Sequence, residues 1–298
     1  MTARGSARGR TTAGAVTQLG TEVSINLGSA LAGLAIPLVG APVVVAVRQI
    51  VMVAVVAPFS RPRFRDLSWR KHWPAILLGL DLAVMNLAFY QSVHLLGLGI
   101  AATIEFLGPL AIALLGSRRV LDAICAIVAG AGVVLLTGFD GTIDVWGVIL
   151  ALTAAAAWAG YILLTRRVAM TLPGLEGLTV GGVVSLVILV PFALIGIGSA
   201  QFSWATVGLL IAIGVLSSAL PYSLDTFILR RIPPRLYAII TAFGPVIAAF
   251  FGFLLLGEVF TLVEIIAILV VCVAAGTAIV TQREQPQSPL ERTAEGLT

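Results

Sequence analysis

Residues 177–198 read GLTVGGVVSLVILVPFALIGIG, a stretch without a single charged side chain. A helix that crosses the hydrocarbon core of a membrane needs about 20 apolar residues, and this stretch is long enough. Backbone groups in lipid must be bonded internally, which leaves helices or closed barrels. The run lacks the alternation of apolar and polar residues that a barrel strand requires. It therefore predicts a transmembrane helix.

Nine further apolar stretches flank this one. They predict helices over 14–38, 41–59, 74–95, 98–117, 120–138, 145–165, 204–227, 235–256 and 261–281. The chain of 298 residues is 59% hydrophobic and only 11% charged, against roughly 45–50% and about 25% in soluble domains. This composition excludes a water-soluble globule and leaves no room for a separate soluble domain. The predicted fold class is an all-α membrane protein with ten transmembrane helices.

The Lys and Arg residues predict the orientation, because cytoplasmic connections retain positive charge. With the N-terminus inside, 17 of the 18 basic residues fall in cytoplasmic loops and tails, and only Arg48 lies within a span. The net charge of +4 then follows from topology, and nucleic acid is not an expected partner. Residues 1–13 and 282–298 are expected to be cytoplasmic tails.

The two halves of the chain, 14–138 and 145–281, repeat one another weakly. Displacing the sequence by 136 positions matches several residues of helix 98–117 to helix 235–256, including Gly108 to Gly244 and Pro109 to Pro245. Each half holds five spans, and because five is odd, the second half enters the membrane in the opposite sense. Such inverted five-helix repeats are typical of secondary transporters, whose substrate site lies between the halves.

Polar residues inside spans are costly and mark candidate functional positions. Glu22 and Asn26 lie one helical turn apart, which favours a face that lines a hydrated cavity. We interpret Ser29 as a contact between helices. Trp158 and Tyr161 lie too deep to anchor the protein at the membrane surface, and they either line the cavity or pack between helices.

Arg48 and Glu105 share a depth of about 10 Å from the outer ends of their helices, at 1.5 Å per residue. One interpretation is a structural ion pair that hides two charges from lipid. The other is a substrate site in which the arginine binds a carboxylate and the glutamate binds an ammonium group, as a zwitterionic amino acid would require. The spacing leaves both open.

Glu22 and Asp81 have no basic residue at their depth. A buried carboxyl group without a cationic partner tends to hold its proton, so either residue is a candidate proton carrier. Asp81 lies on a different face of its helix from Asn86 and Tyr90, so these three side chains are not expected to line one cavity.

Other acidic residues have structural interpretations. Thr261 and Glu264 have the spacing of a capping box, and Asp144 fits the N-cap of helix 145–165. No nucleotide-binding or metal-binding motif is present. We therefore expect neither a cofactor nor a metal.

Four stretches resemble the EamA-type branch of the drug/metabolite transporter superfamily, and most closely its bacterial threonine and homoserine exporters. They are IPLVGAP (36–42), MNLAFYQS (85–92), IEFLGPL (104–110) and SSALPYSLD (217–225). The resemblance implies two inverted five-helix repeats in the bacterial cytoplasmic (inner) membrane, and efflux of amino acids or related metabolites driven by protons. Its pattern is matched at Arg48, Asn86, Tyr90, Glu105, Pro109, Pro221 and Tyr222.

Three prolines lie inside predicted spans of this pattern, namely Pro109, Pro221 and Pro245. A proline in a helix frees a carbonyl group and bends the helix. We expect kinks at all three positions, which either serve the transport movement or are tolerated between neighbouring helices.

The sequence thus predicts an inner-membrane exporter of a small amino acid, working in exchange for protons and without a cofactor. Export of drug-like or other organic metabolites is the alternative within this class, and a membrane-embedded enzyme is the alternative outside it. The oligomeric state is left open. The predicted substrate-binding or coupling residues are Glu22, Asn26, Arg48, Asn86, Tyr90, Glu105, Trp158, Tyr161 and Tyr222.

Overall fold

The computed structural model describes residues 2–60, 68–114, 119–137, 144–231, 237 and 241–280, and within these ranges its regular structure is entirely helical. The first half of the chain forms α1 (Thr2–Val39), α2 (Ala41–Ser60), α3 (Trp69–Leu96), α4 (Leu98–Glu105), α5 (Leu107–Leu114) and α6 (Val120–Thr137). The second half forms α7 (Val145–Thr171), α8 (Glu176–Gly196), η2 (Ile197–Ser199), α9 (Trp204–Gly214), η3 (Val215–Ala219), α10 (Leu220–Arg231), η4 (Thr241–Phe243), α12 (Gly244–Phe251), η5 (Gly252–Leu256) and α13 (Leu262–Val280).

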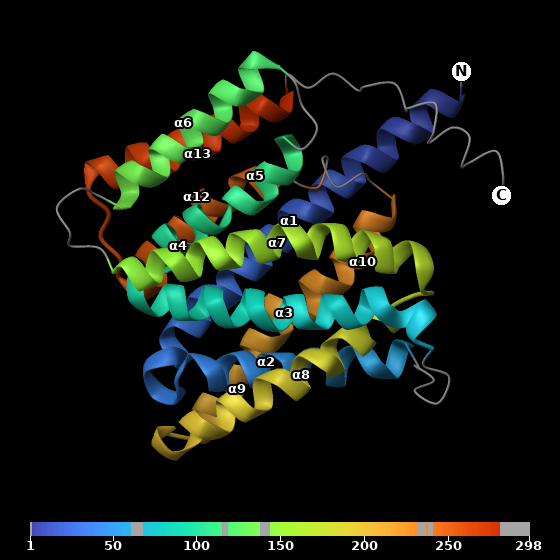
Figure 1. The fold of residues 1–298 in the computed structure, drawn as a ribbon, viewed down its shortest axis with the longest axis vertical. Coiled ribbons are helices and arrows are strands. Elements are labelled where there is room, and N and C mark those ends of the chain that lie inside the picture. Colours follow the sequence, from blue (N-terminus) through green and yellow to red (C-terminus); the bar gives the residue numbers. More distant parts are fainter. Residues whose placement is uncertain are drawn as a thin grey trace.

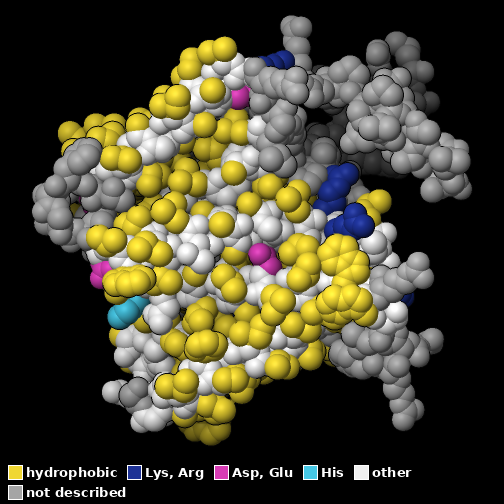
Figure 2. All heavy atoms as spheres, in the orientation of Figure 1, with side chains coloured by type: hydrophobic (Ala, Val, Ile, Leu, Met, Phe, Trp, Pro, Cys, Tyr) yellow, Lys and Arg dark blue, Asp and Glu magenta, His cyan; other side chains and the backbone are white. Residues whose placement is uncertain are grey.

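Six helical segments of the described chain are long and apolar enough to cross a membrane. They are Thr17–Val39, Ala41–Ser60, Lys71–Leu96, Val145–Thr171, Glu176–Gly196 and Trp204–Leu229. Four further apolar helices are shorter, and each falls within a predicted span. Hydrophobic side chains cover much of the molecular face in Figure 2, as expected where the surrounding solvent is lipid.

The helices form one bundle in which α6 and α13 pair along one edge and α2, α8 and α9 lie at the other (Figure 1). Between these edges, α3 packs against α7, and α1 packs against α9, α10 and α12. α1 begins and α13 ends on the same side of the bundle (Figure 1). The centre of the bundle is therefore enclosed by α1, α3, α4, α7, α10 and α12.

Single glycines join successive helices at two places on the opposite side. Gly40 (φ 81°) connects α1 to α2, and Gly97 (φ 84°) connects α3 to α4. Glycine adopts positive φ without a steric penalty, which permits these short reversals. Beside Gly97, the Glu258 carboxylate accepts hydrogen bonds from the backbone N–H groups of Leu98 (2.5 Å) and Gly99 (3.0 Å). Glu258 thus caps α4 from the loop before α13.

Several predicted boundaries differ from the structure: α3 begins at Trp69 rather than at 74, and α7 ends at Thr171 rather than at 165. The helical backbone of α1 begins at Thr2 rather than after a tail of 13 residues. Residues 2–13 contain no proline, and a helix once formed gains one hydrogen bond for each residue added. Helix 98–117 is divided at Phe106 into α4 and α5. The tail 282–298 and the loop arginines Arg61, Arg63, Arg65, Arg118 and Arg235 lie outside the described residues.

The predicted caps are confirmed. Asp144 accepts a hydrogen bond from the backbone N–H of Gly147 (3.0 Å) at the start of α7. Glu264 accepts from the backbone N–H of Thr261 (2.6 Å), and the Thr261 hydroxyl accepts from the backbone N–H of Glu264 (3.3 Å). Both acidic groups therefore have structural roles.

Candidate functional site

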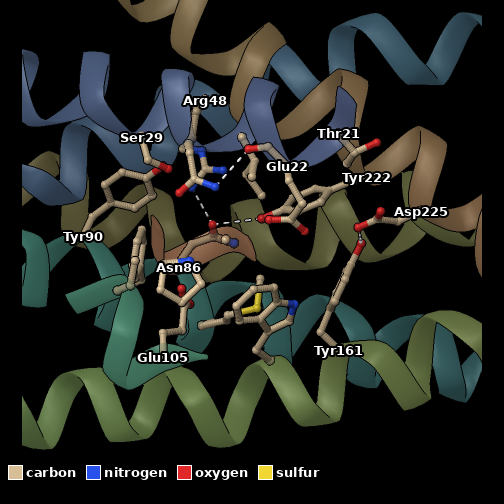
Figure 3. Close-up of a pocket in the computed structure, with 18 of the residues that line it drawn as sticks. Thr21, Glu22, Ser29, Arg48, Asn86, Tyr90, Glu105, Tyr161, Tyr222 and Asp225 are labelled. Carbon is tan, nitrogen blue, oxygen red and sulfur yellow. Dashed lines mark hydrogen bonds between the residues drawn. The ribbon is translucent and has the colours of Figure 1, made fainter. Parts of the chain in front are cut away.

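A cavity at the centre of the bundle is lined from both halves of the chain. α1, α2, α3 and α4 contribute from the first half, and α7, α10, α12 and Tyr237 contribute from the second. All nine predicted binding or coupling residues line it: Glu22, Asn26, Arg48, Asn86, Tyr90, Glu105, Trp158, Tyr161 and Tyr222. In Figure 3, Ser29 and Tyr90 lie at one end and Tyr161 and Asp225 at the other, with Arg48, Asn86 and Glu22 between them.

Arg48 is a deeply buried charge of the cavity, with 2% of its surface exposed. Its Nη1 donates to Asn86 Oδ1 (2.5 Å), and its Nη2 donates to the backbone carbonyl of Ser217 (2.5 Å). The guanidinium also lies 4.7 Å from the centroid of the Tyr90 ring, within cation–π range. Tyr222 completes this group by donating its hydroxyl to Asn86 Oδ1 (3.0 Å). We refer to Arg48, Asn86, Tyr222 and the Ser217 carbonyl as the Arg48 network.

The Ser217 carbonyl is free to accept from Arg48 because of Pro221. In an α-helix the carbonyl of residue 217 would accept from the N–H of residue 221, but proline has no N–H and its ring clashes with that carbonyl. The chain responds with a π-helical segment, η3, directly before Pro221. A π-helical segment thus lies where a kink was expected, and the Ser217 carbonyl accepts from the buried arginine.

The other two prolines follow changes of backbone geometry at equivalent positions. Four residues before Pro109 is Glu105, where α4 ends. Four residues before Pro245 is Thr241, where the short 3-10 turn η4 begins. The displacement of 136 positions relates Pro109 to Pro245 and Glu105 to Thr241. In both places the proline removes the hydrogen bond to the carbonyl group four positions earlier. The Pro109 interruption also places Glu105 at the end of a helix that faces the cavity.

Arg48 and Glu105 do not form the structural ion pair that was one interpretation of their common depth. Among the described residues, no carboxylate lies within 4.0 Å of Arg48, and the ion pair of His72 with Glu176 (3.4 Å) lies outside the residues that line the cavity. Arg48 instead has neutral partners, and its Nε has no hydrogen-bond partner. The cavity therefore holds a buried cation that is not ion-paired with Glu105.

The α1 residues of the cavity form a polar stripe. Gln18 Nε2 donates to Glu22 Oε1 (3.5 Å), and Asn26 Nδ2 donates to the backbone carbonyl of Glu22 (2.9 Å). The hydroxyl of Ser29 bonds that of Tyr90 (3.0 Å), so Ser29 joins two helices as expected and also lines the cavity. The helical spacing in the sequence correctly placed this stripe on one face.

Asp225 and Tyr237 line the cavity but were not among the predicted residues. Asp225 Oδ2 accepts hydrogen bonds from the hydroxyls of Tyr161 (2.9 Å) and Tyr237 (2.8 Å). The spacing of three residues from Tyr222 places Asp225 on the same helical face and could have revealed it. Tyr237 lies at the start of its predicted span, where the sequence does not indicate how deep in the membrane a side chain lies. We call Asp225, Tyr161 and Tyr237 the Asp225 cluster.

Asp81 does not line the cavity. Its carboxyl group faces α7, where a Cβ atom added to Gly160 would lie 2.7 Å from Asp81 Oδ1. Its Oδ2 is buried and has no hydrogen-bond partner. Asn86 and Tyr90, by contrast, both line the cavity, as their different helical face predicted. Nor do the described residues contain a group of three or more His, Cys, Asp or Glu side chains suited to a metal ion.

Comparison with known proteins gives concordant matches. Residues 145–281 match the EamA-like transporter family. The threonine/homoserine exporter RhtA of Salmonella typhimurium strain LT2 is 37% identical over 267 residues, covering 89% of this chain and 90% of that protein. The protein of the same name from Escherichia coli strain K12 is 34% identical over 272 residues, covering 90% and 92%. A solved crystal structure with 22% identity covers 91% of this chain and 99% of its own with a TM-score of 0.64, which shows a shared fold.

Proposed function

The chain belongs to the EamA-like transporter family, and on this premise we propose that it exports small amino acids such as threonine and homoserine, or related metabolites, in exchange for protons. The named substrates belong to the relatives, and the similarity over about nine tenths of both chains makes them the first compounds to test. The protein is proposed to act in the bacterial inner membrane as a secondary transporter.

The observation that carries this proposal is the buried guanidinium of Arg48. A buried charge without a counter-ion costs several kcal/mol, on the order expected for an ion removed from water. Two hydrogen bonds and a ring contact offset part of this cost, but no carboxylate of the described chain lies within 4.0 Å of Arg48. A substrate carboxylate would supply the missing counter-ion.

Glu105 is the proposed partner for the other end of the substrate. It faces the same cavity from α4, outside ion-pair distance of Arg48. An amino acid bound between the two groups would place its carboxylate on the guanidinium and its ammonium on the carboxyl group. Asn86 and Tyr90 contact the guanidinium directly, and Tyr222 is linked to it through Asn86. These three side chains would therefore position the guanidinium.

We also propose that the fold consists of two inverted repeats of five spans. The packing supports this, because several packed pairs of helices have a packed counterpart when each half is exchanged with the other. The pair α3·α7 corresponds to α9·α1, α5·α7 to α12·α1, and α3·α8 to α9·α2, and each of these pairs is packed. The pairs α2·α8 and α6·α13 correspond to themselves and are also packed. A cavity lined from both halves is the expected place for an alternately exposed site.

The proposed orientation places the start of α1 and the end of α13 in the cytoplasm. On the face shown in Figure 2, the coloured Lys and Arg side chains lie toward this end of the bundle and the His side chain lies at the opposite end, while acidic side chains are spread across the face. This distribution supports a cytoplasmic location of the basic end.

Export of drug-like or other organic compounds remains the second candidate, because aromatic side chains make up a large part of the cavity wall. They include Phe89, Tyr90, Trp158, Tyr161 and Tyr222. Such a surface binds planar apolar ligands without a requirement for a carboxylate. The two candidates therefore differ in their dependence on Arg48.

The test is transport by the purified protein in liposomes loaded with labelled threonine, labelled homoserine or a panel of organic compounds. An acidic exterior should drive loss of the labelled amino acid, and a protonophore should abolish the effect. At one-for-one exchange, each pH unit supports an about tenfold concentration ratio. Absence of gradient-driven flux for every amino acid would overturn the proposal.

A pair of Arg48 variants tests the site. Arg48→Ala should lose affinity for amino acids, and Arg48→Lys, which keeps the charge but not the planar fork, should retain part of it. Normal affinity in both variants would exclude Arg48 as the carboxylate ligand. If only organic cations were transported, and equally well by both variants, the second candidate would be favoured.

A further inference from the structure

The Asp225 cluster lies apart from the Arg48 network within the same cavity. Figure 3 shows Asp225 and Tyr161 at the opposite end from Ser29 and Tyr90. Asp225 comes from α10 and only 2% of its surface is exposed. Its two oxygens differ: Oδ2 accepts from two tyrosine hydroxyls, whereas Oδ1 is buried and has no hydrogen-bond partner.

This arrangement fits a carboxyl group that gains and loses a proton. Two hydroxyl donors on one oxygen leave the other oxygen as the place where a proton would bind. With the proton bound, the group is neutral and avoids the cost of a buried charge; without it, the two tyrosines stabilise the carboxylate. A purely structural carboxylate in a membrane would be expected to have a cation beside it, and among the described residues none lies within 4.0 Å of Asp225.

The groups that face Asp225 come from several elements. α1 presents Glu22 and Gln18, α7 presents Tyr161, and Tyr237 completes the group. α8 also packs against α10, but its acidic residue, Glu176, is paired with His72 of α3. Glu22 therefore contributes a second carboxyl group, and no described cation lies within 4.0 Å of it or of Asp225. Two carboxylates in one buried site disfavour being charged together.

The Asp225 cluster is physically connected to the Arg48 network. The rings of Tyr161 and Tyr222 are in contact, with centroids 5.5 Å apart. Tyr161 donates to Asp225, and Tyr222 donates to the same oxygen of Asn86 that accepts from Arg48. Tyr222 and Asp225 also lie on one face of α10. A change in the charge of Asp225 would thus act on the side chains that hold Arg48.

We propose that Asp225, held by Tyr161 and Tyr237, is the residue that binds the transported proton, and that Tyr222 and Asn86 link it to the substrate site at Arg48. This inference rests on the proposed exchange of substrate for protons. The proton binds Oδ1 while the cavity is open to the outside and leaves that oxygen to the cytoplasm when the cavity opens inward. Glu22 shares the site and discourages a second negative charge. Asp81, outside the cavity, takes no part.

The experiment compares two transport modes in liposomes. Counterflow, the exchange of labelled for unlabelled substrate without a pH gradient, requires the substrate site but no proton movement. Accumulation driven by a pH gradient requires both. Asp225→Asn keeps an oxygen that accepts from both tyrosines and should therefore fold. We expect it to retain counterflow and to lose driven accumulation, to the level of protein-free liposomes.

Asp81→Asn is the matched control, because it neutralises another membrane-embedded carboxyl group outside the cavity. It should retain both modes. A pH-sensitive dye inside the liposomes gives an independent readout, since substrate added to the wild-type protein should move protons and substrate added to Asp225→Asn should not.

Each other outcome overturns a defined part of the reasoning. Driven accumulation by Asp225→Asn removes Asp225 from proton binding, and loss of counterflow together with accumulation assigns it to substrate binding or structure instead. Loss of driven accumulation in Asp81→Asn contradicts the exclusion of Asp81. If the wild-type protein shows counterflow but no driven accumulation, the proposed proton exchange fails and this inference with it. Should Asp225→Asn not fold, the paired change Tyr161→Phe and Tyr237→Phe must shift the pH profile of driven transport, and an unchanged profile refutes the role.

Discussion

The hydrogen bond from Arg48 to the Ser217 carbonyl should make the effects of changing Arg48 and Pro221 depend on each other. Ser217 is fully buried, and Pro221 supplies no N–H to its carbonyl. In Arg48→Ala the carbonyl therefore loses its donor. A buried acceptor without a donor costs about 1–3 kcal/mol. In Pro221→Ala the N–H of residue 221 can take over that bond, so this part of the penalty should disappear.

The expected coupling between the two substitutions is thus about 1–3 kcal/mol, with the double variant more stable than the sum of the single effects predicts. The free energy of unfolding in mixed detergent micelles would be measured for the wild type, both single variants and the double variant. The other Arg48 contacts, to Asn86 and Tyr90, are lost in both backgrounds and cancel in the comparison.

Pro191 provides the control, because it also lies inside a membrane helix but is placed in α8. Its substitution by alanine should combine additively with Arg48→Ala. A coupling below about 0.5 kcal/mol between Arg48 and Pro221 is within the usual limit of additivity and would refute the explanation of the free carbonyl. An equal coupling for Pro191 would show that the effect is not specific to Ser217.

Three further outcomes are expected. Gly28→Ala should destabilise the protein by about 1–3 kcal/mol, because the added Cβ would lie 2.8 Å from the backbone nitrogen of Ser217. Gly20→Ala on the same helix is the control, because its added Cβ meets nothing within 4 Å. This variant should stabilise the protein by roughly 0.5–1 kcal/mol. Thermal unfolding of the two variants checks the pair, and equal shifts would contradict the proposed close approach of α1 and η3. Glu258→Ala should cost about 1 kcal/mol by uncapping α4, with faster hydrogen exchange at Leu98 and Gly99; unchanged exchange there would disprove the cap. Glu105→Gln should weaken amino-acid transport while leaving thermal stability near that of the wild type, and unchanged transport at every pH would remove Glu105 from the substrate site.

Local sequence patterns were sufficient for the apolar spans and for several helix ends. Apolar length predicted the spans, and the capping spacing of Thr261 with Glu264 needed only residues adjacent in the chain. The clash of Pro109 with the carbonyl four residues earlier is equally local, which is why the interruption at Phe106 is explained by sequence once it is seen. Helical period also separated Asp81 from the face that carries Asn86 and Tyr90.

The pairing of the buried charges was not accessible in this way. Spacing gave Arg48 and Glu105 the same depth, but depth does not determine how each helix is rotated or how close it comes to its neighbours. In the structure the two groups are not ion-paired. The guanidinium instead donates hydrogen bonds to Asn86 and to the Ser217 carbonyl, which belong to spans remote in the sequence. The partners of Asp225 were inaccessible for the same reason, since Tyr161 and Tyr237 lie on other segments.

By itself, then, the sequence determined that this protein is a membrane bundle, where its apolar spans lie, and several of the polar residues that are buried. These properties follow from hydrophobic burial and backbone hydrogen bonding, which depend on residues within a few turns of one another. Only the tertiary structure decided which buried groups meet, because the rotation and packing of helices depend on the shapes of side chains from every part of the chain. That decision left Arg48 without a carboxylate and Asp225 with two tyrosines and one unpartnered oxygen.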